Sequence, residues 1–272
     1  MAATMKQKNF LENFLQNEQF YINVMSYVII AMGILVNFIL HKIPAPYGRY
    51  NDGSTKWGFQ IDGKVGWILQ ELPALLVPFV CLLIQYKNLP FTKYLANYVL
   101  LALFMCHYVQ RCVIFPLLIR GGKPSPFVTV FMAFIYCMMN GYIQGRTLTK
   151  YADFPPEEVY SPRFMAGCFF FLCGMLINLH SDHLLRNLRK PGETGYKIPR
   201  GGMFEYVSGA NFFGEIVEWM GFAIACWNLP ALSFFIFTFC NLVPRGIAHH
   251  KSYLKKFENY PKNRKAVIPF LC

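Results

Sequence analysis

Seven apolar stretches run through the chain, and each is long enough to cross a lipid bilayer as a helix. Such a helix needs about 20 mostly apolar residues. The stretches are 20–40, 67–86, 94–118, 127–147, 164–185, 209–227 and 229–247. The last two are joined by only a few residues around Pro230, which predicts a tight helical hairpin. The pattern therefore predicts an all-α membrane protein with seven transmembrane helices.

Polar and ionisable side chains interrupt these stretches at helical spacing. Residues three, four or seven positions apart lie on one face of a helix. The stripes are Asn178, Asp182 and Arg189; Asn211, Glu215 and Glu218; Asn241, Arg245, His249 and Tyr253; and, within about one turn, His107, Tyr108 and Arg111. An ionisable residue inside a span is costly and by default indicates a functional site. We expect these stripes to face a shared interior cavity for a large polar ligand.

The sixth stretch shows why its stripe must face inward. Two carboxylates near a span centre cost about 5–7 kcal/mol on insertion scales, whereas ten good apolar residues return only about 3–6 kcal/mol. This helix therefore barely inserts alone, and its acidic stripe needs partner helices or a wet cavity. A hydrogen-bond network between helices, without any ligand, is the alternative.

The second stretch opens with Trp67, Gln70 and Glu71. In its protonated form, a carboxyl group such as Glu71 can donate to a carbonyl oxygen together with a hydroxyl such as Tyr108, as in an oxyanion hole. The alternative is a plain salt bridge between Glu71 and Arg111. From the residues alone, the salt bridge is the more ordinary interpretation.

The sequence predicts one membrane domain over residues 1–272, with a polar N-terminal segment at 1–19 and a tail at 248–272. The longest connections are 41–66 and 186–208. The second is basic, rich in glycine and broken by two prolines, so we expect no helix there. Its N–H groups and cations suit a phosphate, although an ordinary surface loop explains the composition equally.

Composition and charge agree with a membrane protein. The chain is 55% hydrophobic and only 15% charged, with a net charge of +12. When every Lys and Arg except Arg111 is assigned to the nearer side of the membrane, 18 fall on one side and 7 on the other, which predicts a cytoplasmic C-terminus and a lumenal N-terminus. Basic residues and aromatics form no nucleic-acid stripe. The nine cysteines have no zinc-site spacing and are expected to be packing residues, so we expect no metal.

Phosphate and hydrolase motifs such as G-x-G-x-x-G, the P-loop and G-x-S-x-G do not occur. A nucleotide would therefore bind within the helical bundle. Longer strings carry a specific resemblance, and they lie at 67–73 (WILQELP), 107–111 (HYVQR), 118–124 (LIRGGKP), 174–182 (GMLINLHSD), 185–192 (LRNLRKPG), 206–219 (YVSGANFFGEIVEW), 249–250 (HH) and 260–265 (YPKNRK). Through them the chain resembles the steroid 5α-reductases (3-oxo-5α-steroid 4-dehydrogenases) from end to end, and more closely the type 1 isozyme.

This resemblance implies a seven-helix enzyme of the endoplasmic reticulum membrane. Such an enzyme uses NADPH to reduce the 4,5 double bond of a 3-oxo-4-ene steroid that enters from the lipid. By matching position, Glu71 and Tyr108 would be catalytic, and Trp67, Gln70 and Arg111 would shape the steroid end. The implied cofactor-binding residues are Arg120, Asn178, Asp182, Arg189, Asn211, Glu215, Arg245, His249 and Tyr253. One departure is Ile119, which stands where the type 2 isozyme has an asparagine.

Other functions remain open at this point. Polyprenol reductases and trans-2-enoyl-CoA reductases are related to the same family, so a long prenyl or acyl substrate is the nearest alternative. A related membrane methyltransferase would need S-adenosylmethionine instead. A seven-helix receptor is disfavoured because the third span lacks an acidic-Arg-Tyr triplet and the last lacks Asn-Pro-x-x-Tyr. A transporter would also place charges on helices near a cavity.

Overall fold

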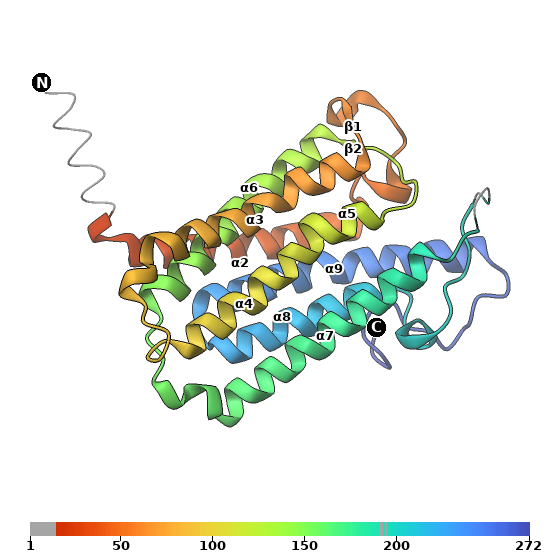
Figure 1. Cartoon of the computed structure of the whole chain (residues 1–272). Coiled ribbons are helices and arrows are strands. Elements are labelled where there is room, and N and C mark those ends of the chain that lie inside the picture. Colours follow the sequence, from red (N-terminus) through yellow and green to blue (C-terminus); the bar gives the residue numbers. More distant parts are fainter. Residues whose placement is uncertain (1–14, 191–192, 194) are drawn as a thin grey trace, which may run out of the picture.

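The computed structural model describes residues 15–190, 193 and 195–272. Most of the predicted N-terminal segment, 1–14, lies outside the described residues, as do three residues of the predicted phosphate loop. Seven long helical units run roughly along one axis (Figure 1). They are α2 (Glu18–Lys42), α3 (Gly63–Gln85), α4 with its continuation η4 and α5 (Leu95–Val109, Gln110–Ile114, Phe115–Leu118), α6 (Phe127–Arg146), α7 (Pro162–Arg186), α8 (Ala210–Cys226) and α9 (Leu229–Lys256).

These helices coincide with the seven predicted stretches, and six are long and apolar enough to cross a membrane. The exception is α8, which has 17 residues. It is the helix whose two carboxylates nearly cancel its apolar residues. Large apolar side chains such as Phe38 (65% exposed) and Leu176 (65% exposed) cover the outside of the bundle. The chain is thus an all-α, multi-pass membrane protein.

Local signals set where the helices begin and turn. Asp62 accepts hydrogen bonds from the N–H groups of Lys64 and Val65 and so caps α3. Asn228 caps α9 in the same way. Between α8 and α9, Trp227 adopts a left-handed conformation (φ 49°), which reverses the chain within the predicted hairpin. The last helix continues nine residues beyond its predicted end at 247, so the tail at 248–272 begins as helix.

Two predicted loops contain short regular segments. Within 41–66 lie η1 (Gly48–Tyr50), η2 (Thr55–Trp57) and the strand β1 (Gln60–Ile61). The strand pairs antiparallel with β2 (Ser125–Pro126), just before α6. The 186–208 connection contains one 3-10 turn, η7 (Gly202–Glu205), which forms after its second proline and has Gly201 as its N-cap residue.

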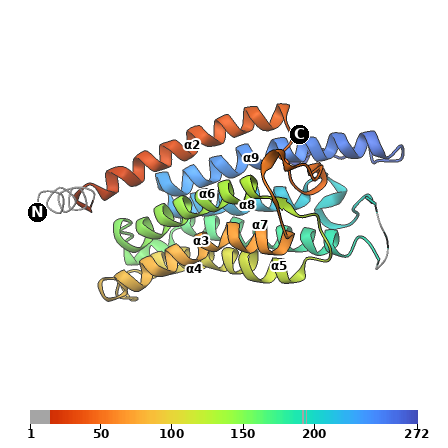
Figure 2. The same ribbon diagram turned by 90° about the horizontal axis from the view of Figure 1, so that it is seen from above.

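The helices pack in pairs, with α7 on α8, α3 on α6 and α2 on α9. From above, α2 and α9 lie together along one edge of the bundle (Figure 2). The main core gathers between α4, α7, α8 and α9 around Phe104, Phe171, Trp219 and Phe222, all nearly or completely buried. This core holds α7 and α8 rigidly beside α4, which carries one of the predicted catalytic residues.

Glycines allow α7 and α8 to approach closely. Gly167 and Gly174 on α7 face Gly214 and Gly221 on α8 with backbone-to-backbone contact. A Cβ atom at Gly174 would collide with the backbone of Glu218. We expect Gly174→Ala to cost about 1–3 kcal/mol of unfolding free energy, because the two helices must move apart. Thermal unfolding in detergent measures this cost. Leu176→Ala, on the lipid-facing side of the same helix, is the control; equal midpoints for the two variants would contradict the prediction.

Candidate active site

An arginine between two acidic residues forms the centre of the polar interior. Arg111 lies on η4, a π-helical turn, which is a distortion often found at functional sites. Its Nη1 is 3.1 Å from Asp182 Oδ2 on α7, and its Nη2 is 3.9 Å from Glu215 Oε2 on α8. The guanidinium also lies over the rings of Trp67 (4.9 Å) and Phe115 (4.7 Å). Arg111 therefore joins the predicted steroid end of the site to the predicted cofactor end.

The two predicted stripes on α7 and α8 face each other. Asn178 Nδ2 donates to the backbone oxygen of Asn211 at 3.0 Å. The Asn211 side chain in turn hydrogen-bonds to Asp182. Asn178 and Asp182 are both buried. Three polar residues from two helices, together with Glu215, thus gather around Arg111.

Glu71 and Tyr108 lie close to each other next to this cluster. Glu71 Oε1 accepts a hydrogen bond from Gln70 Nε2 at 3.2 Å, and its Oε2 accepts one from the Cys137 thiol at 3.7 Å. Tyr108 is 3% exposed and interacts electrostatically with Glu71. The alternative of a Glu71–Arg111 salt bridge was wrong, because the carboxylates within ion-pair distance of Arg111 are those of Asp182 and Glu215.

A buried acid–imidazole pair flanks Tyr108. His107 Nδ1 lies 2.7 Å from Glu218 Oε1, and the imidazole packs edge-on to the ring of Trp219, 4.6 Å between centroids. The helical spacing placed both residues in polar stripes, but their pairing across α4 and α8 was not predicted. The pair fixes the turn of α4 that carries Tyr108 against α8.

The stripe on α9 lies farther along the bundle and is covered by the 41–62 segment. Arg49 Nη2 donates to the Tyr253 hydroxyl at 3.1 Å, and its guanidinium lies 4.7 Å from the centre of that ring. The same guanidinium lies 4.9 Å from the ring of Tyr196, in the 186–208 connection. Arg189 faces the Tyr196 ring at 6.0 Å. One aromatic residue thus links two connections that are distant in sequence.

Two further tyrosines of this segment contact the predicted cofactor residues. The Arg245 guanidinium lies over Tyr47 at 4.8 Å, and Tyr50 packs edge-on to His249 at 5.7 Å. Burial raises the pKa of the Tyr50 hydroxyl above its ordinary value, so this group is a neutral donor at pH 7. Tyr47, Arg49 and Tyr50 were not predicted as site residues. The only sequence signal for them is the dense Tyr-Gly-Arg-Tyr run at 47–50.

Arg120 lies at the edge of this arrangement. It follows α5, and its Nη1 donates to Asn187 Oδ1, at the end of α7, at 3.0 Å. The neighbouring Lys123 donates to the backbone oxygen of Asn51 at 2.8 Å. Arg120 therefore stands beside the cationic connection 186–208, whereas Lys123 is tied to the covering segment.

Several buried polar atoms in this region lack a hydrogen-bond partner among the described residues, including Trp67 Nε1, Ser181 Oγ and Arg245 Nε. Buried polar groups are nearly always paired in native proteins, so unpaired ones suggest a ligand or water. These three atoms come from α3, α7 and α9. The residues present therefore fit a large polar ligand that reaches across several helices.

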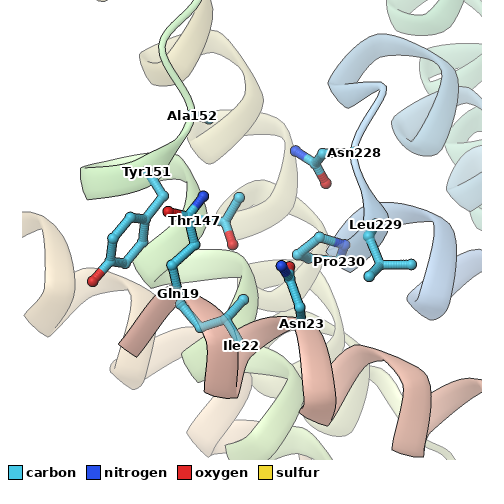
Figure 3. A pocket seen from close by; sticks show the side chains of 9 residues that line it. All are labelled: Gln19, Ile22, Asn23, Thr147, Tyr151, Ala152, Asn228, Leu229 and Pro230. Atoms are coloured by element: carbon cyan, nitrogen blue, oxygen red, sulfur yellow. The ribbon is translucent and has the colours of Figure 1, made fainter. Parts of the chain in front are cut away.

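Two small cavities lie elsewhere, and no predicted site residue lines either. The first, of about 140 Å³, lies between the start of α2, the end of α6 and the α8–α9 hairpin. Gln19, Asn23, Thr147 and Asn228 surround it (Figure 3). The second, of about 290 Å³, is lined by Tyr94, Lys150 and Asp153 among others. Within the described ranges, no three His, Cys, Asp or Glu residues gather to hold a metal ion.

The sequence is similar to those of known proteins. The sequence profile of the family described as 3-oxo-5-alpha-steroid 4-dehydrogenase matches residues 123–272. The chain is 48% identical over 254 residues to 3-oxo-5-alpha-steroid 4-dehydrogenase 1 of Bos taurus, covering 93% of this chain and 98% of that protein. This chain belongs to the 3-oxo-5-alpha-steroid 4-dehydrogenase family.

Relatives of both isozyme types are similar to this chain. The human type 1 enzyme is 46% identical over 93% of this chain and 96% of its own length. The human type 2 enzyme is 44% identical over 90% of this chain and 94% of its own length. The predicted likeness to type 1 is confirmed. Membership of the 3-oxo-5-alpha-steroid 4-dehydrogenase family makes the chain an enzyme of that class.

Proposed function

We propose that this protein reduces the 4,5 double bond of 3-oxo-4-ene steroids with NADPH, giving 5α-reduced 3-oxosteroids. One observation carries the proposal: Glu71 and Tyr108, both potential donors to a keto oxygen, lie beside the Arg111 cluster inside a membrane bundle. A steroid dissolved in lipid reaches such a site without crossing water. Relatives named 3-oxo-5-alpha-steroid 4-dehydrogenase support the same reaction.

NADPH fits the remaining polar residues. Amides and carboxylates suit the ribose and nicotinamide groups, and arginine forks suit phosphate oxygens. The residues that would hold the cofactor are Asn178, Asp182, Asn211 and Glu215 in the inner cluster, Arg245, His249 and Tyr253 on α9, and Arg120 and Arg189 near the connection 186–208. The unpaired Nε of Arg245 supports this assignment.

The mechanism requires polarisation of the 3-keto group. Tyr108, together with the Glu71 carboxyl group whenever that group carries a proton, donates hydrogen bonds to the keto oxygen and draws electrons from the conjugated double bond, which makes carbon 5 electrophilic. The chemistry that NADPH would supply here, when bound, is a hydride for carbon 5. The same two donors then hold the enolate oxygen until carbon 4 takes up a proton. Trp67, Gln70 and Arg111 shape the walls around the steroid ring that carries the keto group.

Product analysis tests the proposal directly. Microsomes from cells expressing the protein are incubated with NADPH and with testosterone, progesterone, a polyprenol or a trans-2-enoyl-CoA, and the products are analysed by mass. We expect saturation of the steroid enones. Reduction of the polyprenol or enoyl-CoA alone would replace the steroid in the proposal by a long-chain substrate, and no reduction of any enone would overturn it.

Two substitutions test the cofactor assignment. Asp182→Ala and Arg189→Ala are each expected to weaken NADPH binding about 10- to 100-fold, because a hydrogen bond to a charged group contributes about 1.5–3 kcal/mol. Titration of the purified variants with NADPH measures the dissociation constant. Asp153→Ala, at the second cavity, is the control. Unchanged NADPH affinity in both variants would remove these residues from the cofactor site.

The proposed location is the endoplasmic reticulum membrane, with the C-terminus in the cytoplasm. The excess of Lys and Arg on one side of the predicted spans supports this orientation. Epitope tags at the two ends, probed in sealed microsomes with protease, test it. A protected C-terminal tag would reverse the proposed orientation.

A further inference from the structure

The last residues of the chain fold back onto the bundle instead of ending beyond α9. We call residues 266–272 the C-terminal hook. Its base is held by backbone hydrogen bonds of 2.9 Å, from Lys265 N to Tyr206 O and from Gly209 N to Ala266 O. The hook closes on itself, because Val267 N and Ile268 N both donate to the backbone oxygen of Cys272 at 2.8 Å. The hook is therefore a defined structure with a fixed position.

The hook packs at the depth of the membrane-spanning helices. Ala266 and Val267 are buried against Ile216 of α8 and Leu242 of α9. A Cβ atom on Gly246 would collide with Val267, so the hook touches the α9 backbone there. Since α9 rises about 1.5 Å per residue, Leu242 lies about 21 Å back from its end at Lys256.

The figures agree with this depth. In both views the C-terminus lies beside the bundle, near the level at which α5 ends, and well short of the outer end of α9 (Figures 1 and 2). α5 completes a unit that is apolar and long enough to cross a membrane. The chain end is therefore expected near the boundary between hydrocarbon and headgroups.

The outer side of the hook presents large apolar side chains. Phe270 is 81% exposed and Leu271 is 77% exposed. Phe270 has a left-handed backbone (φ 66°), which residues other than glycine rarely adopt. Its ring packs edge-on to Tyr206, 5.9 Å between centroids, which is itself 49% exposed. An aromatic, apolar tip of this kind is typical of anchors at the membrane interface.

Cationic residues precede this tip in the chain, and the backbone N–H of Lys265 donates to Tyr206, the ring partner of Phe270. Lys262 and Lys265 are exposed in the segment that leads into the hook. Basic residues close to a membrane surface attract anionic lipid headgroups. Charge complementarity thus selects acidic phospholipid as the partner of this surface.

We propose that the C-terminal hook inserts Phe270 and Leu271 into the interface of the surrounding membrane, with Lys262 and Lys265 at the headgroups of anionic phospholipids. Buried Val267 fixes the hook on α9, and the apolar tip fastens the same segment to lipid. The hook thereby attaches the part of the chain that follows the α9 cofactor stripe to the membrane.

Fluorescence quenching tests the insertion. Phe270→Trp and, as the control, Glu258→Trp are reconstituted into nanodiscs, with the unmodified protein giving the background of its four tryptophans. Glu258 is exposed just beyond the end of α9. We expect brominated phospholipid to remove most of the emission added by Phe270→Trp and little of that added by Glu258→Trp, whereas aqueous iodide should do the reverse. Quenching of the added indole at position 270 by iodide and not by brominated lipid would overturn the proposal.

The lipid preference has its own test. Brominated phosphatidylserine should quench the emission added by Phe270→Trp more strongly than the same fraction of brominated phosphatidylcholine. Adding Lys262→Gln and Lys265→Gln should remove that difference while quenching by phosphatidylcholine persists. Equal quenching by the two lipids before the lysines are changed would overturn the role of anionic headgroups.

Discussion

Replacing Tyr108 with Phe is expected to lower turnover about 100- to 1,000-fold and to leave NADPH binding in place. The change removes one hydroxyl, and the loss of one donor to a developing oxyanion costs about 2.7–4 kcal/mol of transition-state stabilisation. The Phe ring can keep the contacts of the native ring, which lies 4.8 Å from Phe104 and 6.2 Å from Trp219. The effect on turnover should therefore exceed the effect on stability.

Glu71→Leu is expected to cause a loss of similar size for the same reason. If both residues hold one oxygen, the double variant should lose much less than the product of the two single losses, because residues that act as a unit are not additive. Single-turnover rates at saturating NADPH and steroid measure the chemical step. NADPH titration and thermal unfolding show whether each variant remains folded and loaded.

Tyr136→Phe is the matched control for a neighbouring hydroxyl. Tyr136 lies on α6 next to Cys137, and its hydroxyl is buried without a hydrogen-bond partner. Its ring stacks on Phe237 at 4.0 Å, a contact that Phe preserves. Turnover should stay close to normal in this variant. Near-normal turnover in both Tyr108→Phe and Glu71→Leu would remove the catalytic assignment.

The helices were predictable because the lipid environment requires the same apolar composition of every span. Every span must be apolar over about 20 residues, and that requirement is visible in the sequence without knowledge of neighbours. The stripes on α7 and α8 were predictable for a related reason. Asn178 and Asp182 share one helical face, and a lipid-facing position for them would be too costly, so they had to point inward.

The choice of partners was not predictable from single helices. Helical spacing places Arg111 and Tyr108 on one turn, but it does not say which helix lies opposite. The sequence offered Glu71 as the partner of Arg111, whereas the fold brings Asp182 and Glu215 within reach from two other helices. That outcome depends on the glycine contacts between α7 and α8, which set where both carboxylates stand.

The contacts of the 41–62 segment with α9 could not be predicted from the sequence, for another reason. Tyr47 and Arg49 lie in a stretch rich in glycine and proline, where no period links side chains to one face. The Arg49 contact with Tyr253 joins residues 204 positions apart in the chain. The burial of Glu18 was not predicted either. It falls within the predicted polar N-terminal segment, whereas in the structure it is a buried residue in the first turn of α2.

Glu18→Ala is expected to cost about 3–5 kcal/mol of unfolding free energy, because it leaves the buried Arg146 cation without its counter-charge. The Glu18 carboxylate is 2.6 Å from both Nε and Nη2 of Arg146 and 2.9 Å from Lys150 Nζ. The hydroxyls of Tyr142 and Tyr151 donate to it as well, each at 2.6 Å. This one side chain ties the start of α2 to the end of α6.

A double substitution distinguishes the loss of this ion pair from a loss of packing. Glu18→Leu combined with Arg146→Leu should be less destabilised than Glu18→Ala, because both buried charges are then removed together. Unfolding in mixed micelles measures all three proteins, with Glu258→Ala as an exposed control. The NADPH affinity of folded Glu18→Ala should be unchanged, since Glu18 makes its contacts at the end of the bundle away from the α9 stripe. A stability within about 1 kcal/mol of the unmodified protein for Glu18→Ala would show that the carboxylate is dispensable, and that the packing of α2 on α9 and α6 is sufficient.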